Sequence, residues 1–435
     1  MVIILSFVAA VVLMVIGVPV AFSFSLPVVF LYMLEGIDIS MIPYTGFYNI
    51  TSFTTLAIPF FIYLGDIMAA GGCVQPLVNV TKLLVGKMKY ALAQVVVVVN
   101  IFFGAITGSG VAAVAATGGL LYPILKAEGY DKNYCAALMA SSGAIGFLIP
   151  PSIPLVVFAS VVSGSSVGDL FMGGILPGLI LAGLFMIINH FKCRQSPVEA
   201  AASALPRDYR QQEEGGSSKL HTVLVSIPAF MLPVIILGGI YGGFLDSTSA
   251  AGIACIYAIL VGLFVYRKLK LRTFVQATKD SAVSIACIFV VMFILAGLSE
   301  IMIMLQVPQS LTNAVVSLGL PRGVMLFAIA MLLVLFGMIM DAVSGMLVVA
   351  PLLNNLMLTL DVSTTQFGII MCVAFALGLI TPPVAANIYV AGKIADTPIT
   401  KFMKDLVPFM AAFFIVLMLV TYIPAISCWL PSLGK

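Results

Sequence analysis

Charged residues are scarce in this sequence. Asp, Glu, Lys and Arg make up 9% of the 435 residues, whereas a typical soluble domain has about 25%. Hydrophobic residues make up 62%, and the mean hydropathy is +1.20. A chain with so little charge cannot cover a soluble surface, so the composition predicts an all-α, polytopic membrane protein in contact with a lipid bilayer.

Groups that support metal, redox or hydrolytic chemistry are also few. The seven cysteines are scattered without a C-x-x-C pair, which argues against a thiolate metal site and a disulfide framework. A serine nucleophile in the Gly108-Ser109-Gly110 segment would need an adjacent base. The two histidines, His190 and His221, instead flank a hydrophilic segment far along the chain. No G-x-x-x-x-G-K-[ST] motif is present. The sequence therefore does not support an enzyme, an ATPase or a nucleic-acid-binding protein.

Two helix-breaking motifs interrupt the apolar sequence of the first half. They are Gly108-Ser109-Gly110 and Gly146-Phe147-Leu148-Ile149-Pro150-Pro151. Glycine and proline interrupt helices, and irregular backbone at membrane depth is tolerated only where it is buried in protein or lines a cavity. Both breaks thus indicate a binding site, although glycine and proline can also simply kink packed helices.

Both motifs recur in the second half. Ser344-Gly345 and Gly378-x-x-x-Pro382-Pro383 follow their counterparts at offsets of 235 and 232 residues, and Glu300-Ile301-Met302 follows Asp66-Ile67-Met68 at 234. Three matches in one order at nearly constant offset indicate an internal duplication. Duplicated halves with broken helices are typical of secondary transporters.

The apolar runs divide the chain into two repeats. We expect a first repeat at 1–191, a cytoplasmic linker at 192–221 and a second repeat at 222–435. The first repeat should contain scaffold helices within 2–35, an external loop at 36–51 and transport elements within 52–166. These transport elements are a helix at 52–72, a re-entrant hairpin of 90–106 and 109–125, and an element at 133–166 that is broken at the double proline. The second repeat should contain scaffold helices within 222–266, an arm at 267–280 and transport elements within 281–396. These transport elements are a helix at 281–304, a hairpin of 323–340 and 345–360, and a broken element at 364–396. Helices at 168–191 and 406–428 should close the two repeats. The apolar amino terminus has no basic region before it, so we expect a first membrane helix there rather than a cleaved signal peptide.

The positive-inside rule supports this layout. If each hairpin returns to its own side and each broken element crosses once, 18 of the 20 Lys and Arg lie in cytoplasmic segments. Only Arg322 and Lys435 lie outside. The two repeats then have opposite orientations, which makes them an inverted-topology repeat.

The breaks suggest two kinds of ligand. Helices that end at a break present free carbonyls, which suit a hard cation such as Na⁺, and helices that start there present amides that suit a carboxylate. We expect two or more Na⁺ ions to be co-transported. The candidate sodium ligands are Thr107, Gly108, Ser109, Gly146, Ile149, Pro150, Asp341, Gly345, Gly378, Thr381 and Pro382. The candidate substrate-binding residues are Gly110, Pro151, Ser152, Ser344, Pro383 and Asn387.

Three acidic residues lie in or beside apolar spans: Asp66, Glu300 and Asp341. Ionisable groups in the hydrocarbon region are costly and usually functional, so each could ligate an ion or relay a proton. The alternative is that Asp66 and Glu300 lie at hydrated helix ends.

Several motifs together resemble the large membrane subunit of tripartite ATP-independent periplasmic (TRAP) transporters. They are Ala57-Ile58-Pro59-Phe60-Phe61, Gly65-Asp66-Ile67-Met68, Gly108-Ser109-Gly110, Ile149-Pro150-Pro151-Ser152-Ile153-Pro154, Leu170-Phe171-Met172-Gly173-Gly174-Ile175-Leu176-Pro177-Gly178 and Gly378-Leu379-Ile380-Thr381-Pro382-Pro383. The resemblance covers nearly the whole chain. One departure is Asp341-Ala342-Val343-Ser344, which keeps the aspartate of the second hairpin tip but lacks the Thr-Pro that often accompanies it.

The resemblance implies sodium-driven uptake of an organic acid, such as sialic acid or a C4-dicarboxylate, across a bacterial inner membrane by an elevator motion. It also implies two partners, a periplasmic substrate-binding protein and a small four-helix membrane subunit. The alternative is a single-component Na⁺ or H⁺/carboxylate symporter of related elevator fold.

Overall fold

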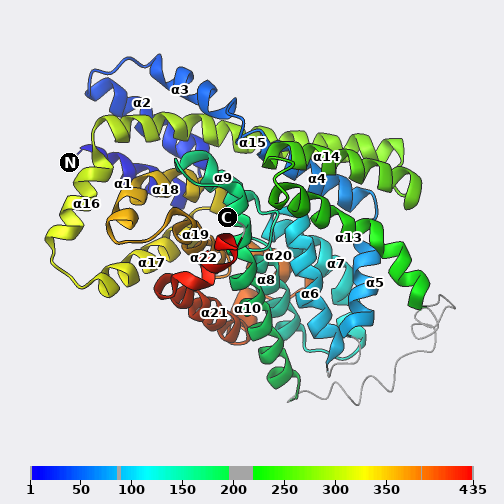
Figure 1. Ribbon diagram of the computed structural model, residues 1–435. Coiled ribbons are helices and arrows are strands. Elements are labelled where there is room, and N and C mark those ends of the chain that lie inside the picture. The colour runs from blue at the N-terminus through cyan, green and yellow to red at the C-terminus, as the bar shows by residue number, and fades with distance from the viewer. Residues whose placement is uncertain (1, 86–89, 195–218, 384, 434–435) are drawn as a thin grey trace.

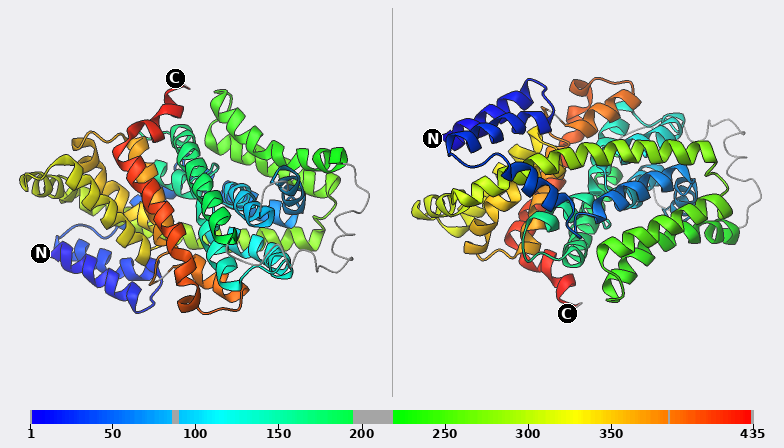
Figure 2. Two further views of the ribbon diagram at one scale, coloured as in Figure 1. Left: turned by 90° about the horizontal axis from the view of Figure 1, so that it is seen from below. Right: turned by 90° about the horizontal axis from the view of Figure 1, so that it is seen from above.

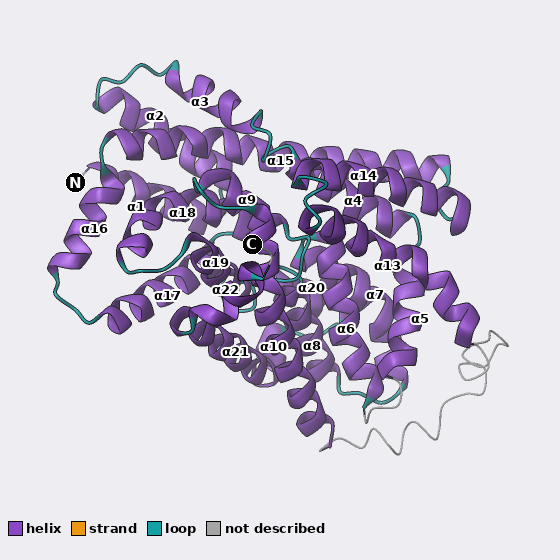
Figure 3. Ribbon diagram, viewed as in Figure 1, coloured by secondary structure: helices purple, strands orange, loops and turns teal. Residues whose placement is uncertain are grey.

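The computed structural model describes residues 2–85, 90–194, 219–383 and 385–433. Every regular element in these ranges is a helix (Figure 3). Eight of the described helices are long and apolar enough to cross a membrane, and a bent pair adds a ninth. This all-helical, multi-span architecture confirms the predicted fold class.

The same order of elements occurs twice (Figure 1). The first repeat contains α1 (Val2–Val15), α2 (Val20–Leu34), α4 (Ala57–Ala70), α5 (Val74–Val85), the hairpin α6 (Ala91–Thr107) and α7 (Gly110–Ala127), the broken helix α8 (Lys132–Ile145) and α9 (Ile153–Val161), and α10 (Val167–Arg194). The second contains α13 (Lys219–Tyr241), α14 (Ser247–Leu260) with the π-helix η1 (Val261–Val265), α15 (Leu271–Met304), α16 (Val307–Ser317), the hairpin α17 (Arg322–Ile339) and α18 (Ala342–Thr359), the broken helix α19 (Thr364–Gly378) and α20 (Ala386–Ile394), and α21 (Ile399–Tyr422). The counterparts α5 and α16 lie at opposite ends of the molecule (Figure 1).

Two expectations for the segments before the hairpins were wrong. The segment expected as an external loop contains a helix, α3 (Met41–Ile50). It packs on α15, where a Cβ at Gly46 would lie 2.6 Å from the Phe293 ring, and Phe47 meets the same ring edge-on at 5.3 Å. From Leu271 onward, the expected arm and the helix expected at 281–304 form one continuous helix of 34 residues, α15. A long-range contact thus orders the first segment, and in the second no glycine or proline lies near the expected junction at residue 280.

The remaining differences lie at helix ends. The helix expected at 52–72 begins only at Ala57, and α16, the counterpart of α5, was not predicted. The last helix begins at Ile399 rather than 406 and breaks at Ile423, after which α22 (Pro424–Ser432) follows. Most of the expected linker, 195–218, lies outside the described residues.

The two repeats interlock through their broken helices. Helix α9 of the first repeat packs against α18 in the hairpin of the second, and α20 of the second packs against α7 in the hairpin of the first. Helices α10 and α21 also pack against each other beside them (Figure 2). These two reciprocal contacts, α9 with α18 and α20 with α7, are expected when the halves are related by a two-fold axis. They join both hairpins and both broken helices into one body.

Segments expected on one side of the membrane lie together. On the predicted cytoplasmic side, Lys192 and Asp405 form an ion pair of 2.7 Å, and Thr397 Oγ1 donates to Asn133 Oδ1 at 2.8 Å. On the predicted external side, the exceptional cation Arg322 donates from Nε to the Leu360 carbonyl at 2.7 Å. Arg322 therefore satisfies the carboxyl end of α18, where a cation is favourable.

Candidate functional site

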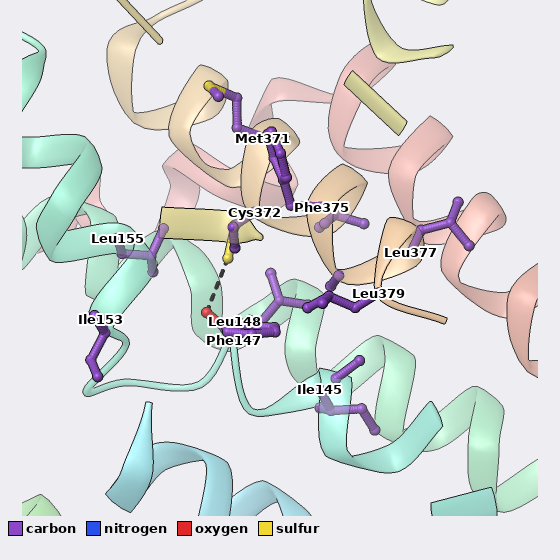
Figure 4. Close-up of a cluster of buried hydrophobic side chains, with 14 of the residues drawn as sticks. Ile145, Phe147, Leu148, Ile153, Leu155, Met371, Cys372, Phe375, Leu377 and Leu379 are labelled. Carbon is purple, nitrogen blue, oxygen red and sulfur yellow. Dashed lines mark hydrogen bonds between the residues drawn. The ribbon is translucent and has the colours of Figure 1, made fainter. Parts of the chain in front are cut away.

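The first break follows from the chemistry of its two prolines. Pro150 and Pro151 carry no N–H, so the carbonyls of Gly146 and Phe147 have no amide donor four residues further on. The Phe147 carbonyl accepts instead from two side chains, the Ser152 hydroxyl and the Cys372 thiol, the latter at 3.0 Å (Figure 4). Because Cys372 belongs to α19, the second repeat helps to hold the break of the first.

The tip of the first hairpin touches this break. Helix α6 ends at Thr107, and its C-cap Gly108 has a φ of +58°, in the left-handed region that favours glycine. A Cβ at Gly108 would lie 2.5 Å from Ile153 Cγ1, at the first residue of α9. Ser109 caps α7 by accepting from the Ala112 amide at 3.4 Å. The amino-terminal ends of α7 and α9 are therefore neighbours, and each has a serine, Ser109 or Ser152, at its N-cap.

Gly146 has a second role that the sequence did not reveal. A Cβ built on Gly146 would lie 2.2 Å from Gly104 Cα, and one on Gly104 would lie 2.0 Å from Gly146 Cα. Neither position has room for a side chain. The end of α8 therefore packs backbone to backbone against the hairpin helix α6.

The second break repeats this packing but is more open. A Cβ at Gly378 would lie 2.2 Å from the carbonyl carbon of Gly337 on α17. The Thr381 hydroxyl donates to the Leu377 carbonyl at 2.7 Å, which leaves its lone pairs available. Pro150 and Pro151 are buried, whereas Pro382 is half-buried and Pro383 is exposed.

The tip of the second hairpin is built around Asp341. One carboxylate oxygen accepts from the amides of Val343 and Ser344 at 3.0 and 3.1 Å, and the other accepts from the Ser344 hydroxyl at 2.6 Å. Asp341 is thus the N-cap of α18. It is exposed rather than embedded in protein, while Gly345 in the same turn faces the Phe375 ring.

The structure brings two predicted substrate-binding residues from different repeats together. A Cβ at Gly110 would lie 3.1 Å from Asn387 Nδ2. That nitrogen donates to the Ala140 carbonyl at 3.1 Å. Asn387 is completely buried, and its Oδ1 has no partner among the described residues. A polar acceptor from α20 is therefore buried beside the amino terminus of α7.

The other two acidic candidates, Asp66 and Glu300, lie outside the hairpins and broken helices. Asp66, on α4, is half-buried and accepts from the Ser281 hydroxyl of α15 at 2.6 Å. Glu300, on α15, is also half-buried. The backbone of Thr107 ends α6, and its side chain is outside what the structure describes. Asp66 and Glu300 thus lie on α4 and α15, the helices that precede the hairpins, and not at the breaks.

Two features that position the site were missed. Asn100 Nδ2 donates to the Ser142 hydroxyl and Asn100 Oδ1 accepts from the Thr117 hydroxyl, both at 2.8 Å, so a buried polar network joins α6, α7 and α8. In α10, a Cβ at Gly174 would lie 2.2 Å from the Leu148 carbonyl oxygen, and one at Gly178 would lie 2.4 Å from the Ile149 side chain. The glycines of the Leu170–Gly178 motif were the available signal for this second contact.

Comparison with known proteins gives consistent matches. The family model described as "Tripartite ATP-independent periplasmic transporter, DctM component" matches residues 7–426. The C4-dicarboxylate TRAP transporter large permease protein DctM of Vibrio cholerae is 32% identical over 99% of this chain and 97% of its own length. The isethionate TRAP transporter permease protein DctMQ of Oleidesulfovibrio alaskensis is 35% identical over 95% of this chain, which spans 64% of that longer protein.

One solved structure extends the comparison to the fold. The YdaH transporter of Alcanivorax borkumensis matches with a TM-score of 0.61 over 88% of both chains, at 16% sequence identity. At that identity the match concerns the fold alone.

Proposed function

The chain belongs to the DctM component family of tripartite ATP-independent periplasmic transporters, and from this premise we propose that it is the large permease subunit for sodium-coupled uptake of an organic acid. The family consists of transporter permeases of the bacterial inner membrane rather than enzymes. The observation that carries the proposal is the contact of Gly108 with Ile153. It joins the tip of a re-entrant hairpin to the break of a transmembrane element.

Sodium coupling is supported by the backbone at the breaks. The prolines leave the Gly146 carbonyl without a helical donor, and close packing on Gly104 holds that residue in place. A carbonyl fixed in position, with the Ser109 hydroxyl on the neighbouring tip, suits a small hard cation. Thr381 and Asp341 offer comparable oxygens in the second repeat.

A carboxylate substrate is supported by the helix starts. The amides of α7 and α9 begin at neighbouring points, where their partial positive charges attract an anion. Asn387 Oδ1, buried beside the start of α7, could accept a hydrogen bond from a substrate hydroxyl or amide. The names of the relatives include C4-dicarboxylate, sialic acid and 2,3-diketo-L-gulonate transporters, all acidic solutes.

The motion we propose is an elevator. The hairpins and broken helices hold each other through α9 on α18 and α20 on α7, so they can move as one block. The pairs α1–α2 and α13–α14 would form the stationary scaffold. A small four-helix membrane subunit would brace that scaffold, and a periplasmic substrate-binding protein would deliver the substrate.

Reconstituted transport tests this function. Proteoliposomes with this chain, its small subunit and its loaded binding protein should take up a radiolabelled acid when Na⁺ is high outside, without ATP. Equal uptake with K⁺ in place of Na⁺ would overturn sodium coupling. Uptake by this chain alone would favour the single-component symporter.

A further inference from the structure

We propose that the segment 267–272, at the junction of η1 and α15, is a binding site for the headgroup of an anionic phospholipid. Its sequence is Arg267-Lys268-Leu269-Lys270-Leu271-Arg272. All four cationic residues are exposed. Within the described residues none of the four forms an ion pair, so their charge is available to an external anion.

The backbone of this segment is held in place, so the cations form a site rather than a loose tail. The amides of Lys268 and Leu269 both donate to the Gly262 carbonyl, at 3.1 and 3.2 Å. Leu269 is buried and anchors the turn. The stem of Lys268 lies on Gly72, where a Cβ would lie 2.7 Å from Lys268 Cγ.

The first turn of α15 adds amide donors to the same place. Lys270 occupies the N-cap position without a side-chain cap, and the Thr273 hydroxyl donates to the Lys270 carbonyl instead of accepting from an amide. The helix has 34 residues, so its start carries the positive end of a long macrodipole. Uncapped amides among four cations suit a phosphate group.

Apolar neighbours indicate that the phosphate belongs to a lipid. Phe264, Val265 and Leu271 are 69%, 53% and 79% exposed; the first two precede the cations along the chain, and Leu271 lies between Lys270 and Arg272. Basic residues beside exposed apolar ones are typical of segments at the headgroup and acyl boundary of a bilayer. A soluble phosphate would gain nothing from these apolar side chains.

The position gives this lipid a role. Lys268 lies on the bend between α4 and α5, and Tyr266, one residue before the cluster, donates from its hydroxyl to the Val225 carbonyl of α13 at 2.9 Å. An anionic lipid bound here would fix the junction of α13, α15 and the α4–α5 bend at the membrane surface.

The test is lipid-dependent stability of the purified full-length chain in detergent. Phosphatidylglycerol should raise the thermal unfolding midpoint more than phosphatidylcholine does. The variant Arg267→Gln, Lys268→Gln, Lys270→Gln, Arg272→Gln should bind phosphatidylglycerol at least about tenfold more weakly, since each cation near a membrane surface contributes roughly fivefold. A matched control is Lys126→Gln, Lys132→Gln, Lys401→Gln, Lys404→Gln, which removes four exposed cations elsewhere and should respond like the wild type.

Two further measurements use the wild-type protein alone, so they do not depend on whether a variant folds. The stabilisation of wild type by phosphatidylglycerol should shrink between 0.1 M and 1 M KCl, because the screening length falls from about 10 Å to 3 Å. Inorganic phosphate should not replace the lipid. Stabilisation that is unaffected by salt, reproduced by inorganic phosphate, retained in the cluster variant or lost equally in the control variant would overturn the proposal.

Discussion

Gly104 and Gly146 lie backbone against backbone, with Gly146 Cα within 2.0 Å of where a Cβ on Gly104 would be. Gly337 and Gly378 repeat this contact in the second half, at offsets of 233 and 232 residues. In each repeat the end of the first broken-helix segment thus rests on the hairpin. The position of the free carbonyls at the break therefore depends on a contact between helices.

Gly104→Ala should destabilise the protein and abolish coupled uptake. The added methyl must push α6 and α8 apart, and overpacking of this kind typically costs about 1–3 kcal/mol. Gly183→Ala on α10 is the matched control, because nothing lies within 4 Å of a Cβ there, and alanine is a better helix former. Thermal unfolding and uptake would be measured for both. A normal unfolding midpoint and normal uptake in Gly104→Ala would contradict the packing described.

Ser109→Ala and Thr381→Ala should raise the Na⁺ concentration for half-maximal uptake. Losing a ligand to a charged partner typically costs about 1.5–3 kcal/mol, which is about 10- to 150-fold in apparent affinity. Assembly with the small subunit should not change. Ser109→Thr keeps a hydroxyl and should restore most of the affinity, which separates ligation from loss of the α7 cap. Unchanged Na⁺ dependence in both alanine variants, with loss of that dependence in Asp66→Asn, would assign the coupling to the acids.

Asp341 should have two separable roles. Asp341→Ala removes the cap of α18 and should cost about 0.5–2 kcal/mol of stability. Asp341→Asn keeps an acceptor for the amides of Val343 and Ser344, so it should fold normally yet require more Na⁺. Unfolding and Na⁺ titrations of both variants check this. An asparagine variant with wild-type Na⁺ dependence would leave Asp341 with the capping role alone.

Cross-linking should distinguish the moving block from the scaffold. Phe102 on α6 and Phe230 on α13 have ring centroids 5.0 Å apart, and they would lie on opposite sides of the sliding surface. In a background that keeps only the buried Cys372 of the native cysteines, Phe102→Cys with Phe230→Cys, joined by a short bifunctional thiol reagent, should arrest uptake but leave substrate binding intact. The control pair is Phe158→Cys with Phe367→Cys, whose rings are 5.5 Å apart within the block. Full uptake after efficient cross-linking of the first pair would argue against an elevator.

Local chemistry in the sequence was sufficient for the membrane class, the duplication and the location of both breaks. Glycine, proline and apolar runs act on the residues beside them, so the ends of α6 and α7 and the interruption between α8 and α9 fall within a few residues of the prediction. The sequence also identified Gly110 and Asn387 as candidates, and the structure places them side by side.

Contacts between residues far apart in the chain decided the rest. The sequence predicts the Gly146 carbonyl as a sodium ligand. The structure shows that Gly146 must also lack a side chain, because the Gly104 backbone packs directly against it. The sequence of the 36–51 segment does not predict α3, because packing on Phe293, some 250 residues away, orders this ten-residue helix. The apolar neighbours of Asp341 drew attention to its charge, but only the structure shows that its carboxylate caps α18. Hydropathy describes composition along the chain. Only the tertiary structure determines which backbone segments contact each other, because those contacts depend on how the two repeats pack together.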